Sequence, residues 1–426
     1  MSQNADHVRQ LADRLLKQQA PAALRQQLAP RLDNLPARIA GASRADAATL
    51  ERRWKALGAA PEIRAELLDP TTAERAESYA RNIENLIGTV KIPVGLAGPL
   101  RVNGLHAQGD FYVPLATTEA ALVASYSRGA QLITEAGGCA AVLTAEAVSR
   151  SPAFAFRTLA EAAEFAVWAA GQREAFAVAV ATTTRHGRLD DVRFTLEGNH
   201  VYLILDFTTG DASGQNMVTI AAQAVCEHIV AHTPVQPEHW FVEANLSGDK
   251  KASAQSFVSV RGRKVSAEVE LPAELVAKRL HAPVATMIEY WRMSALGGVM
   301  SGTIGVQGHV ANGLAALFLA CGQDVACVAE AAVGVTRFEQ RPDGALYAAV
   351  TLPNIIVGTV GGGTGLPSQA ACLDLLGLRG EGKARALAEV CAALALAGEL
   401  SIIGALAAQQ FARAHQRLAR GRKAHG

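Results

Sequence analysis

The amino-acid sequence predicts an α+β fold with a helical N-terminal region. Residues 1–80 alternate polar and apolar positions at helical spacing, with Arg, Gln, Glu and Ala dominant. Between about residues 155 and 240, helix-like stretches flank two strand-like runs, 192–196 and 201–207. The chain has 426 residues and is 50% hydrophobic, enough for two or three globular domains. We therefore expect a compact domain inserted in this middle part of the chain.

The elements before the inserted domain are predicted from caps and breakers. A Pro- and Gly-rich run at 92–100 excludes a regular helix and indicates a turn-rich segment near a site. Thr117-Thr118-Glu119 is expected to open a helix with a threonine cap, and Gly137-Gly138 is expected to end it near residue 136.

The elements after the inserted domain follow from periodicity. Residues 257–271 are typical of a hairpin that turns at Arg261-Gly262-Arg263. Beyond residue 300 the pattern predicts helices at about 311–331 and 382–413, and apolar strands at about 346–357.

Charge and composition disfavour several classes of partner. Lys and Arg number 40 against 39 Asp and Glu, so no basic excess favours nucleic acid. The six cysteines are dispersed in apolar contexts, which indicates reduced thiols in a cytoplasmic protein. The N-terminus lacks the apolar stretch of a signal peptide. The most apolar segment, 386–412, contains Glu389 and Glu399, so we interpret it as a core helix and expect no membrane span.

Three short motifs could hold an anion. Asp249-Lys250-Lys251 follows a loop of small residues and could stabilise an anion or a developing oxyanion, although a solvated turn is the alternative. The Gly-rich stretch 358–365 is neither a Walker A loop nor a Rossmann GxGxxG motif, and it could equally be a structural turn. Residues 210–216 follow a strand and precede a helix, a position suited to a nucleotide-binding loop.

One helix carries side chains that could bind a metal. His228 and His232 lie four residues apart near Cys226. No matching ligand pair accompanies them, so a surface or core helix is the better interpretation and no metal site is predicted.

Taken in order along the chain, the motifs resemble those of the hydroxymethylglutaryl-coenzyme A (HMG-CoA) reductase family. The resemblance covers about residues 80–420. The motif sequences are most similar to those of the eukaryotic/archaeal class, and they imply a soluble form without the membrane anchor of that class. The matching segments are 84–100, Ala116-Thr117-Thr118-Glu119 with 122–125, 210–216, Asp249-Lys250-Lys251, Ala320-Cys321-Gly322-Gln323-Asp324, 358–364 and 398–401 through to His415.

The resemblance implies a domain arrangement. It places a helical region at 1–80 and a large acyl-CoA-binding catalytic domain at 81–150 and 252–426. A small ferredoxin-like domain at 151–241 would bind the dinucleotide without a Rossmann fold, and 242–251 would be the connecting catalytic loop.

The resemblance also implies four catalytic residues, Glu119, Lys250, Asp324 and His415. Lys250 would stabilise the oxyanion that forms when a thioester carbonyl accepts hydride. His415 would protonate the departing thiolate. Glu119 would donate a proton to the aldehyde oxygen, and Asp324 would tune the pKa values of both Glu119 and Lys250.

Further residues match binding positions of the family. Those implied for the acyl group are Asn85, Arg150, Asp249, Lys251, Arg292 and Asn312, and those on the CoA side are Ser125, Arg128 and His309. Those implied for the dinucleotide are Thr184, Arg185 (at the 2′-phosphate), Asp211, Ser213, Gly214, Gln215, Asn216, Gly361 and Gly362.

Several positions depart from the family pattern. A serine that contacts the acyl group is Glu243 here, and a substrate-binding lysine is Arg292. Ser213 and Gln215 differ in the dinucleotide loop, and an asparagine of the CoA helix is Ser127. These changes leave the reduction machinery in place and bear on the acyl substrate.

The resulting prediction is a cytoplasmic oxidoreductase of the mevalonate pathway, and hence of isoprenoid biosynthesis. It would reduce HMG-CoA to mevalonate and CoA with NADPH, NADH remaining open. The family implies a homodimer or homotetramer with active sites at the subunit interface. The alternatives are a divergent reductase of another acyl-CoA thioester and a non-catalytic paralogue that binds CoA or a nucleotide.

Overall fold

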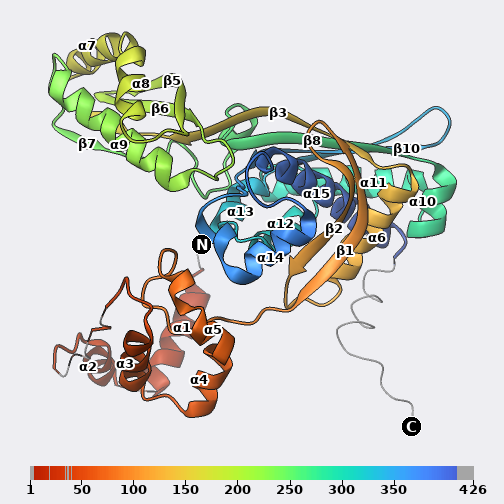
Figure 1. Cartoon of the computed structure of the whole chain (residues 1–426), viewed down its shortest axis with the longest axis horizontal. Coiled ribbons are helices and arrows are strands. Elements are labelled where there is room, and N and C mark those ends of the chain that lie inside the picture. Colours follow the sequence, from red (N-terminus) through yellow and green to blue (C-terminus); the bar gives the residue numbers. More distant parts are fainter. Residues whose placement is uncertain (1–3, 19, 34, 36–37, 40, 410–426) are drawn as a thin grey trace. The chain divides into compact units, whose positions relative to one another are not determined.

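The structure is a computed structural model that describes residues 4–18, 20–33, 35, 38–39 and 41–409. The predicted catalytic residue His415 lies outside the described residues. The chain forms two compact units, Met1–Thr89 and Val90–Gly426, which are drawn in Figure 1.

The first unit is helical, as predicted. Arg53 is buried on α3 and donates hydrogen bonds to the carbonyls of Leu86 (2.7 Å) and Arg44 (2.9 Å). Trp54, one residue further on, donates to the carbonyl of Ile87 (2.9 Å). These bonds tie segment 84–88 to α3. The helices are α1 (Ala5–Gln18), α2 (Pro21–Leu28), α3 (Ala47–Leu57), α4 (Pro61–Leu67), α5 (Pro70–Glu74) and η1 (Ala76–Tyr79).

The second unit is built on a mixed sheet, which in the described chain has ten strands. One strand, β3 (Cys139–Arg150), belongs to two parts of it: residues 140–147 pair with β8, and residues 148–150 pair with β6. The other strands are β1 (Val94–Gly104), β2 (Gln108–Ala116), β4 (Ala153–Ala155), β5 (Arg188–Glu197), β6 (His200–Thr208), β7 (His239–Phe241), β8 (Gly262–Leu271), β9 (Val335–Gln340) and β10 (Leu346–Ile355).

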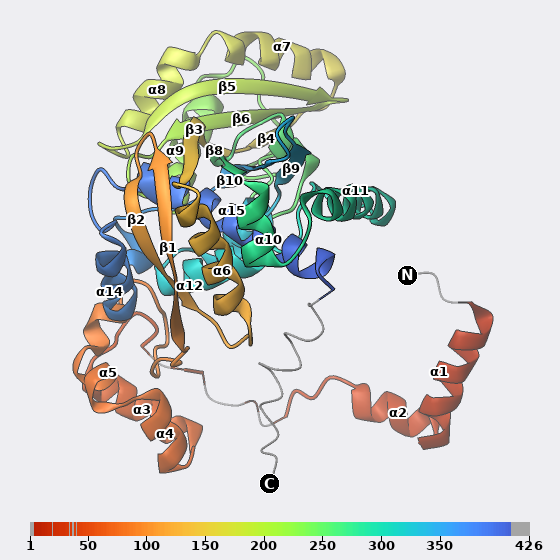
Figure 2. The ribbon, with the colours of Figure 1, turned by 90° about the vertical axis from the view of Figure 1, so that its right-hand side faces the viewer.

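The smaller part of this sheet is ferredoxin-like. Its strands are antiparallel in the order β7-β4-β6-β5, and the chain order is β4, α7–α8, β5, β6, α9, β7. The helices α7 (Leu159–Ala170), α8 (Arg173–Ala181) and α9 (Gln215–His232) accompany these strands (Figure 2). This part has its own core, in which Phe154, Phe165 and Phe176 are fully buried. The predicted α+β class with a small ferredoxin-like domain is therefore confirmed, while the predicted domain limits stay a prediction.

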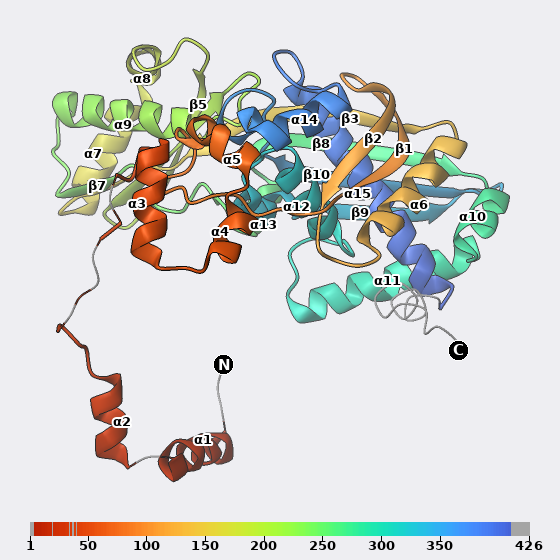
Figure 3. The same cartoon turned by 60° about the horizontal axis from the view of Figure 1, so that its bottom comes forward.

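The larger part packs helices around a central one, α15 (Ala384–Ala407). This helix contacts α6, α12, β8 and β10 and runs through the middle of the large core (Figure 3). The other helices are α6 (Leu122–Glu135), η2 (Ala254–Phe257), α10 (Ala273–Leu280), α11 (Val284–Ser301), α12 (Val310–Ala320), η3 (Val325–Cys327), α13 (Val328–Ala331), η4 (Gly362–Gly365) and α14 (Pro367–Leu376).

Helix α15 is long and apolar enough to cross a membrane by length and composition, but 83% of its apolar stretch is buried within the chain. Its two carboxylates are fully buried and accept backbone N–H bonds. Glu389 accepts from His106 (2.8 Å) and Ala107 (2.7 Å). Glu399 accepts from Gly308 (2.6 Å) and His309 (2.7 Å). Because both carboxylates accept hydrogen bonds from backbone amides inside this fold, α15 is a core helix, as predicted.

Three predicted elements are wrong. Most of the run 92–100, which was expected to be rich in turns, belongs to the strand β1 and pairs with β2. The helix expected from Thr117 begins at Leu122, because Ala121 has a left-handed backbone (φ 70°) that cannot continue a helix. Thr117 instead accepts a hydrogen bond from the amide of Glu119 (3.0 Å) in a local turn. The hairpin expected at residues 261–263 is a 3-10 helix followed by the single strand β8, and the Arg261 side chain is buried rather than in a solvated turn.

Candidate active site

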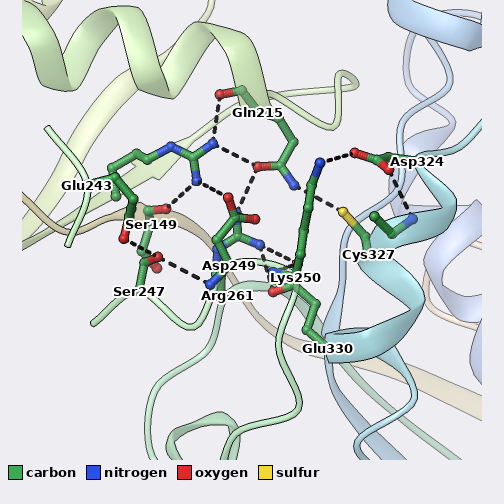
Figure 4. A network of polar contacts seen from close by, with 12 residues as sticks. Ser149, Gln215, Glu243, Ser247, Asp249, Lys250, Arg261, Asp324, Cys327 and Glu330 are labelled. Atoms are coloured by element: carbon green, nitrogen blue, oxygen red, sulfur yellow. Dashed lines mark hydrogen bonds and ion pairs between the residues drawn. The ribbon is translucent and has the colours of Figure 1, made fainter. Parts of the chain in front are cut away.

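Lys250 and Asp324, two of the four residues expected to be catalytic, form an ion pair. Lys250 Nζ lies 2.8 Å from Asp324 Oδ2, and both side chains are partly exposed, at 43% and 39% (Figure 4). Asp324 stands at the start of η3, where its other oxygen accepts the amide of Ala326 (3.0 Å). The hydrogen bond to Asp324 raises the pKa of Lys250, although burial opposes this. Lys250 is therefore a fixed cation at neutral pH.

Arg150 occupies the end of β3, beside the predicted catalytic loop. Its guanidinium lies 3.1 Å from Asp249 Oδ2 and donates to Thr219 (2.9 Å) and to the Gln215 side chain (3.1 Å). The predicted substrate residues Arg150 and Asp249 are therefore in direct contact with each other.

Sequence reasoning missed Arg261 and Glu330, which lie beside this pair. Both side chains are buried, and Arg261 Nη1 donates to both Glu330 oxygens at 2.6 Å. Arg261 belongs to the turn that the sequence predicts at 261–263, where a buried side chain is not expected. The only signal for Glu330 in the sequence is a lone carboxylate in the apolar stretch 325–333.

A cavity of about 400 Å³ collects a second group of predicted residues. Its polar lining includes Glu119, Ser125, Arg128, His309 and Asn312, and its apolar lining includes Leu122 and Ile402. It therefore brings together all three residues predicted on the CoA side.

Ser401 organises one wall of this cavity. Its hydroxyl lies 2.9 Å from that of Ser125, and its hydroxyl and carbonyl accept from Arg128 (2.8 and 2.9 Å). Ser401 belongs to α15, so the central helix positions the cationic wall.

His309 is held rigidly in the same cavity. Its Nε2 lies 2.8 Å from the carbonyl of Gly398, so this nitrogen must carry the proton and Nδ1 is left as an acceptor. Burial lowers the pKa of His309. Tyr126 donates to the His309 carbonyl (2.8 Å), which fixes the backbone as well. A neutral imidazole is thus presented to the cavity.

Glu119 and Asn312 also line a second cavity of about 360 Å³. Val328, from the same segment as Asp324, lies on its wall. Glu119 is in the turn before α6 rather than on the helix. The short stretch from η3 to α13 therefore borders the second cavity at Val328 and carries Asp324 at its start.

The two predicted glycine-containing loops pack against each other. A Cβ on Gly358 would lie 2.5 Å from the backbone nitrogen of Ser213, so only glycine allows this approach. The amide of Thr359 donates to the carbonyl of Asp211 (2.8 Å). Gly361 and Gly362 lie in the same loop, with open space beside their α-carbons.

Asp211 serves the backbone rather than facing outward. Its carboxylate accepts the amides of Gly382 (2.7 Å) and Ala384 (3.1 Å) at the start of α15. Burial favours a higher pKa for Asp211, but these backbone hydrogen bonds outweigh it and the pKa is lowered. The carboxylate of Asp211 therefore ties the 210–216 loop to the start of α15.

Residues 184–187 form a turn beside the first turns of α9. Thr184 accepts from the amides of His186 (3.1 Å) and Gly187 (3.2 Å) and contacts the sulfur of Met217 (3.1 Å). Arg185 is exposed and has no hydrogen bond or ion pair within the described residues. Gly214 precedes α9 with a left-handed backbone, and Asn216 is exposed in the first turn of that helix.

Other predicted residues lie elsewhere or are engaged differently. The side-chain oxygen of Gln215 accepts hydrogen bonds from Arg150 and Arg261, and its side-chain nitrogen donates to Cys327 Sγ (3.1 Å). Lys251 donates to the carbonyl of Asp249 (2.8 Å). Arg292 is exposed on α11, 3.7 Å from Glu289. Asn85 belongs to the first unit, where its backbone N–H donates to the carbonyl of Ala42 (2.8 Å).

Glu243 is engaged by its own loop. Its carboxylate accepts from the amides of Ser151 (3.1 Å) and Asn245 (2.8 Å) and from the hydroxyl of Ser247 (3.0 Å). Glu243, which departs from the family pattern, therefore stabilises the start of the 242–251 segment and ties it to the end of β3.

Comparison with known proteins identifies the family. The sequence model of hydroxymethylglutaryl-coenzyme A reductase matches residues 49–420. The 3-hydroxy-3-methylglutaryl-coenzyme A reductase of Methanothermobacter thermautotrophicus is 43% identical over 343 residues, covering 80% of this chain and 86% of the relative. That of Aeropyrum pernix is 44% identical over 357 residues, covering 82% and 85%.

The fold has solved counterparts as well. The class II 3-hydroxy-3-methylglutaryl-CoA reductase from Streptococcus pneumoniae, solved bound to NADPH in open conformations, matches with a TM-score of 0.64 at 19% identity. The match covers 84% of this chain and 96% of that one. At this identity the likeness concerns the fold alone. The family resemblance seen in the motifs is confirmed by the sequence matches, and this chain belongs to the hydroxymethylglutaryl-coenzyme A reductase family.

Proposed function

We propose that this chain reduces HMG-CoA to mevalonate and CoA with two NADPH. This reaction belongs to the mevalonate pathway of isoprenoid biosynthesis. The observation that carries the proposal is the Lys250–Asp324 pair, a fixed cation in the position that the family motif assigns to it. The 43–44% identity to archaeal enzymes of that name supports it.

The chemistry requires a cation at the carbonyl oxygen in both reductions. NADPH supplies hydride, first to the thioester carbonyl and then to the aldehyde. Lys250 stabilises the oxyanion in each case because its ammonium is already oriented by Asp324. Glu119, which lines both cavities, donates the proton to the aldehyde oxygen.

The thioester step also needs a proton for the departing CoA thiolate. We assign this proton to His415, whose type suits the task at neutral pH. His309 is a poor donor, because its Nε2 proton is directed to the carbonyl of Gly398 and burial lowers its pKa.

The residues assigned to the substrate form two sets. Arg150, Asp249, Lys251, Asn312, Asn85 and Arg292 would hold the acyl group, and Ser125, Arg128 and His309 the CoA side. The hydrogen bonds that Glu243 accepts from two backbone amides and the hydroxyl of Ser247 disperse part of its negative charge, so it repels an anionic acyl group less than a free carboxylate would.

The chain offers groups that fit NADPH. Arg185, which has no ion pair within the described residues, belongs to the turn whose Thr184 contacts Met217 near the N-terminus of α9, and the dipole of that helix favours a phosphate. An arginine there would favour the 2′-phosphate of NADPH over NADH. Gly361 and Gly362 leave room for close approach of the dinucleotide.

The same proposal includes assembly and location. Helix α11 exposes Met293, Leu296, Val299 and Met300, an apolar face that supports a homodimer or homotetramer with sites at the interface. All six cysteines are free, which supports a cytoplasmic location.

An assay that crosses two cofactors with several acyl-CoAs tests the function. Purified protein should oxidise two NADPH per HMG-CoA consumed and release mevalonate and free thiol in equal amounts. NADH should be used less well. The proposal is refuted if HMG-CoA is inert while another acyl-CoA is reduced, or if no acyl-CoA is reduced.

A further inference from the structure

The backbone of Lys250 has an unusual conformation. Its φ is 56°, in the left-handed region that a lysine seldom adopts. Its side chain is drawn to Asp324, while its backbone N–H donates to Glu330 Oε1 (3.2 Å). Such a conformation persists only where the surroundings fix it. Glu330 is therefore one of the groups that hold Lys250 in place.

Glu330 is held in turn by Arg261. The two side chains are 0% and 2% exposed, and Arg261 Nη1 contacts both carboxylate oxygens at 2.6 Å. Its Nη2 lies 2.7 Å from Asp249 Oδ1 and donates to Gln215 Oε1 (2.8 Å). The guanidinium of Arg261 thus contacts both Asp249, the residue before Lys250, and Glu330, which accepts the Lys250 amide, as Figure 4 shows.

A buried ion pair is an inefficient way to stabilise a fold. Removing two charges from water costs several kcal/mol, and apolar side chains of similar volume often serve stability as well. Burial raises the pKa of Glu330 even though the charge of Arg261 opposes the rise. The cost of burying the pair is explained if it has a second task.

We infer that Arg261 and Glu330 are positioning residues for the reduction, which set the backbone of Lys250 so that its ammonium meets Asp324 and the substrate oxygen. Neither needs to touch the substrate. The inference rests on the proposed function, because it assigns a task in that same reaction.

Two variants separate positioning from simple support of the fold. Glu330→Gln removes the charge that Arg261 and the Lys250 amide share. It should lower kcat about 10²-fold while KM for HMG-CoA and NADPH changes less than about threefold, as for a misplaced catalytic group. Arg261→Met with Glu330→Leu replaces the pair by apolar side chains and should unfold in urea near the wild-type midpoint, yet keep the low kcat.

The outcomes are decisive in both directions. Recovery of kcat together with the unfolding midpoint in the double variant would show that the pair only supports the fold. If the double variant does not fold, the unfolding midpoint of Glu330→Gln takes its place. A midpoint near that of wild type together with a kcat about 10²-fold lower supports positioning, and a kcat that is unchanged, or that falls only in proportion to the folded fraction, overturns the inference. The control is Arg101→Met with Asp110→Leu, which removes another arginine–aspartate ion pair, on β1 and β2, and should leave kcat unchanged.

A measurement without turnover keeps this inference separate from the proposed function. Acetylation of Lys250 by acetic anhydride, followed across pH by peptide mass spectrometry, reports how well Asp324 holds the ammonium. Lys250 should become reactive at lower pH in Glu330→Gln than in wild type, with Lys278 as internal reference. Equal profiles overturn the positioning role even if the enzyme is active. A shifted profile in a chain that reduces no acyl-CoA refutes the function alone.

Discussion

At the scale of single residues, the candidate active site depends on charges that are paired before a substrate arrives. Lys250 is held at its ammonium by Asp324 and at its amide by Glu330, and Arg150 is held by Asp249. Groups oriented in advance need not reorganise when negative charge develops. The partial exposure of Lys250 and Asp324 leaves the ammonium accessible, while Glu330, which holds the Lys250 amide, and its partner Arg261 are buried.

Lys250→Ala removes the cation while leaving the fold. We expect kcat for HMG-CoA to fall by about 10²–10³-fold, as when an oxyanion-stabilising group is lost. The unfolding free energy should change by less than about 1 kcal/mol, since the lysine side chain is partly exposed. Steady-state kinetics and urea unfolding measure the two, with Lys278→Ala on α10 as control. Near-normal turnover would remove Lys250 from the mechanism.

Asp324→Asn should move the alkaline limit of activity. Asp324 raises the pKa of Lys250 because it stabilises the charged form, so the neutral amide of asparagine lets that pKa fall. The ammonium is then lost at lower pH, and the rate should decline at lower pH than in wild type. The pH dependence of kcat for both proteins is the measurement. An unchanged alkaline limb would mean that another group controls it.

The sequence contains part of this arrangement. Motif resemblance is enough to assign Lys250 and Asp324 to one site, because the residue types and their order are specific. Arg261 and Glu330 could not be found that way, since neither lies in one of the matching motifs and nothing local signals that an arginine in Arg-Gly-Arg is buried. Their pairing is a property of the tertiary structure.

At the scale of elements, α15 is the central support of the large core. Its apolar faces contact helices and strands on several sides, and its two carboxylates take up amides that would otherwise be buried without partners. An unsatisfied buried amide costs about 1–3 kcal/mol. The two carboxylates therefore hold the turns at 104–107 and 308–309 against α15.

Glu399→Ala should destabilise the protein strongly. The change strands the amides of Gly308 and His309, so we expect the unfolding free energy to fall by about 2–4 kcal/mol. Glu381→Ala, an exposed glutamate shortly before α15, should change it by less than about 0.5 kcal/mol. Urea denaturation compares the two. A loss below about 1 kcal/mol for Glu399→Ala would show that water or a rearranged turn satisfies these amides.

Periodicity predicts the existence of these elements better than their ends. The 382–413 pattern and the strand pair 192–196 and 201–207 match α15, β5 and β6. The start of α6 was misplaced, because a left-handed alanine has no sequence signature. The division of β3 between two parts of the sheet was also invisible, since strand partners are set by residues far away in the chain.

At the scale of the whole molecule, two cores share one strand. The ferredoxin-like part encloses its own aromatic cluster, and β3 leads from the large core to Arg150 at its margin. Gln215, at the start of α9, brings the small part into contact with Arg150 and Arg261. The side proposed for the cofactor and the side proposed for the acyl group therefore meet at buried polar contacts.

Arg185→Ala should separate the two nicotinamide cofactors. A charge-assisted contact to a 2′-phosphate is worth about 1.5–3 kcal/mol, so KM for NADPH should rise about 10–100-fold. NADH lacks that phosphate and should be affected less than about twofold. Arg157→Ala removes an exposed arginine that lies just before α7 and pairs with Glu161, and it is the control. Equal losses with both cofactors would show that Arg185 does not recognise the phosphate.

The connection between β1–β2 and α15 has a consequence for synthesis on the ribosome. Glu389 bonds to His106 across 283 residues, which at 5–20 residues per second separates their emergence by about 15–60 s. The strands and helices of the ferredoxin-like part are all made within that interval. A nascent chain therefore has a complete small domain while the interior of the large one is still unfilled, so chaperone protection is needed most between the emergence of β7 and that of α15.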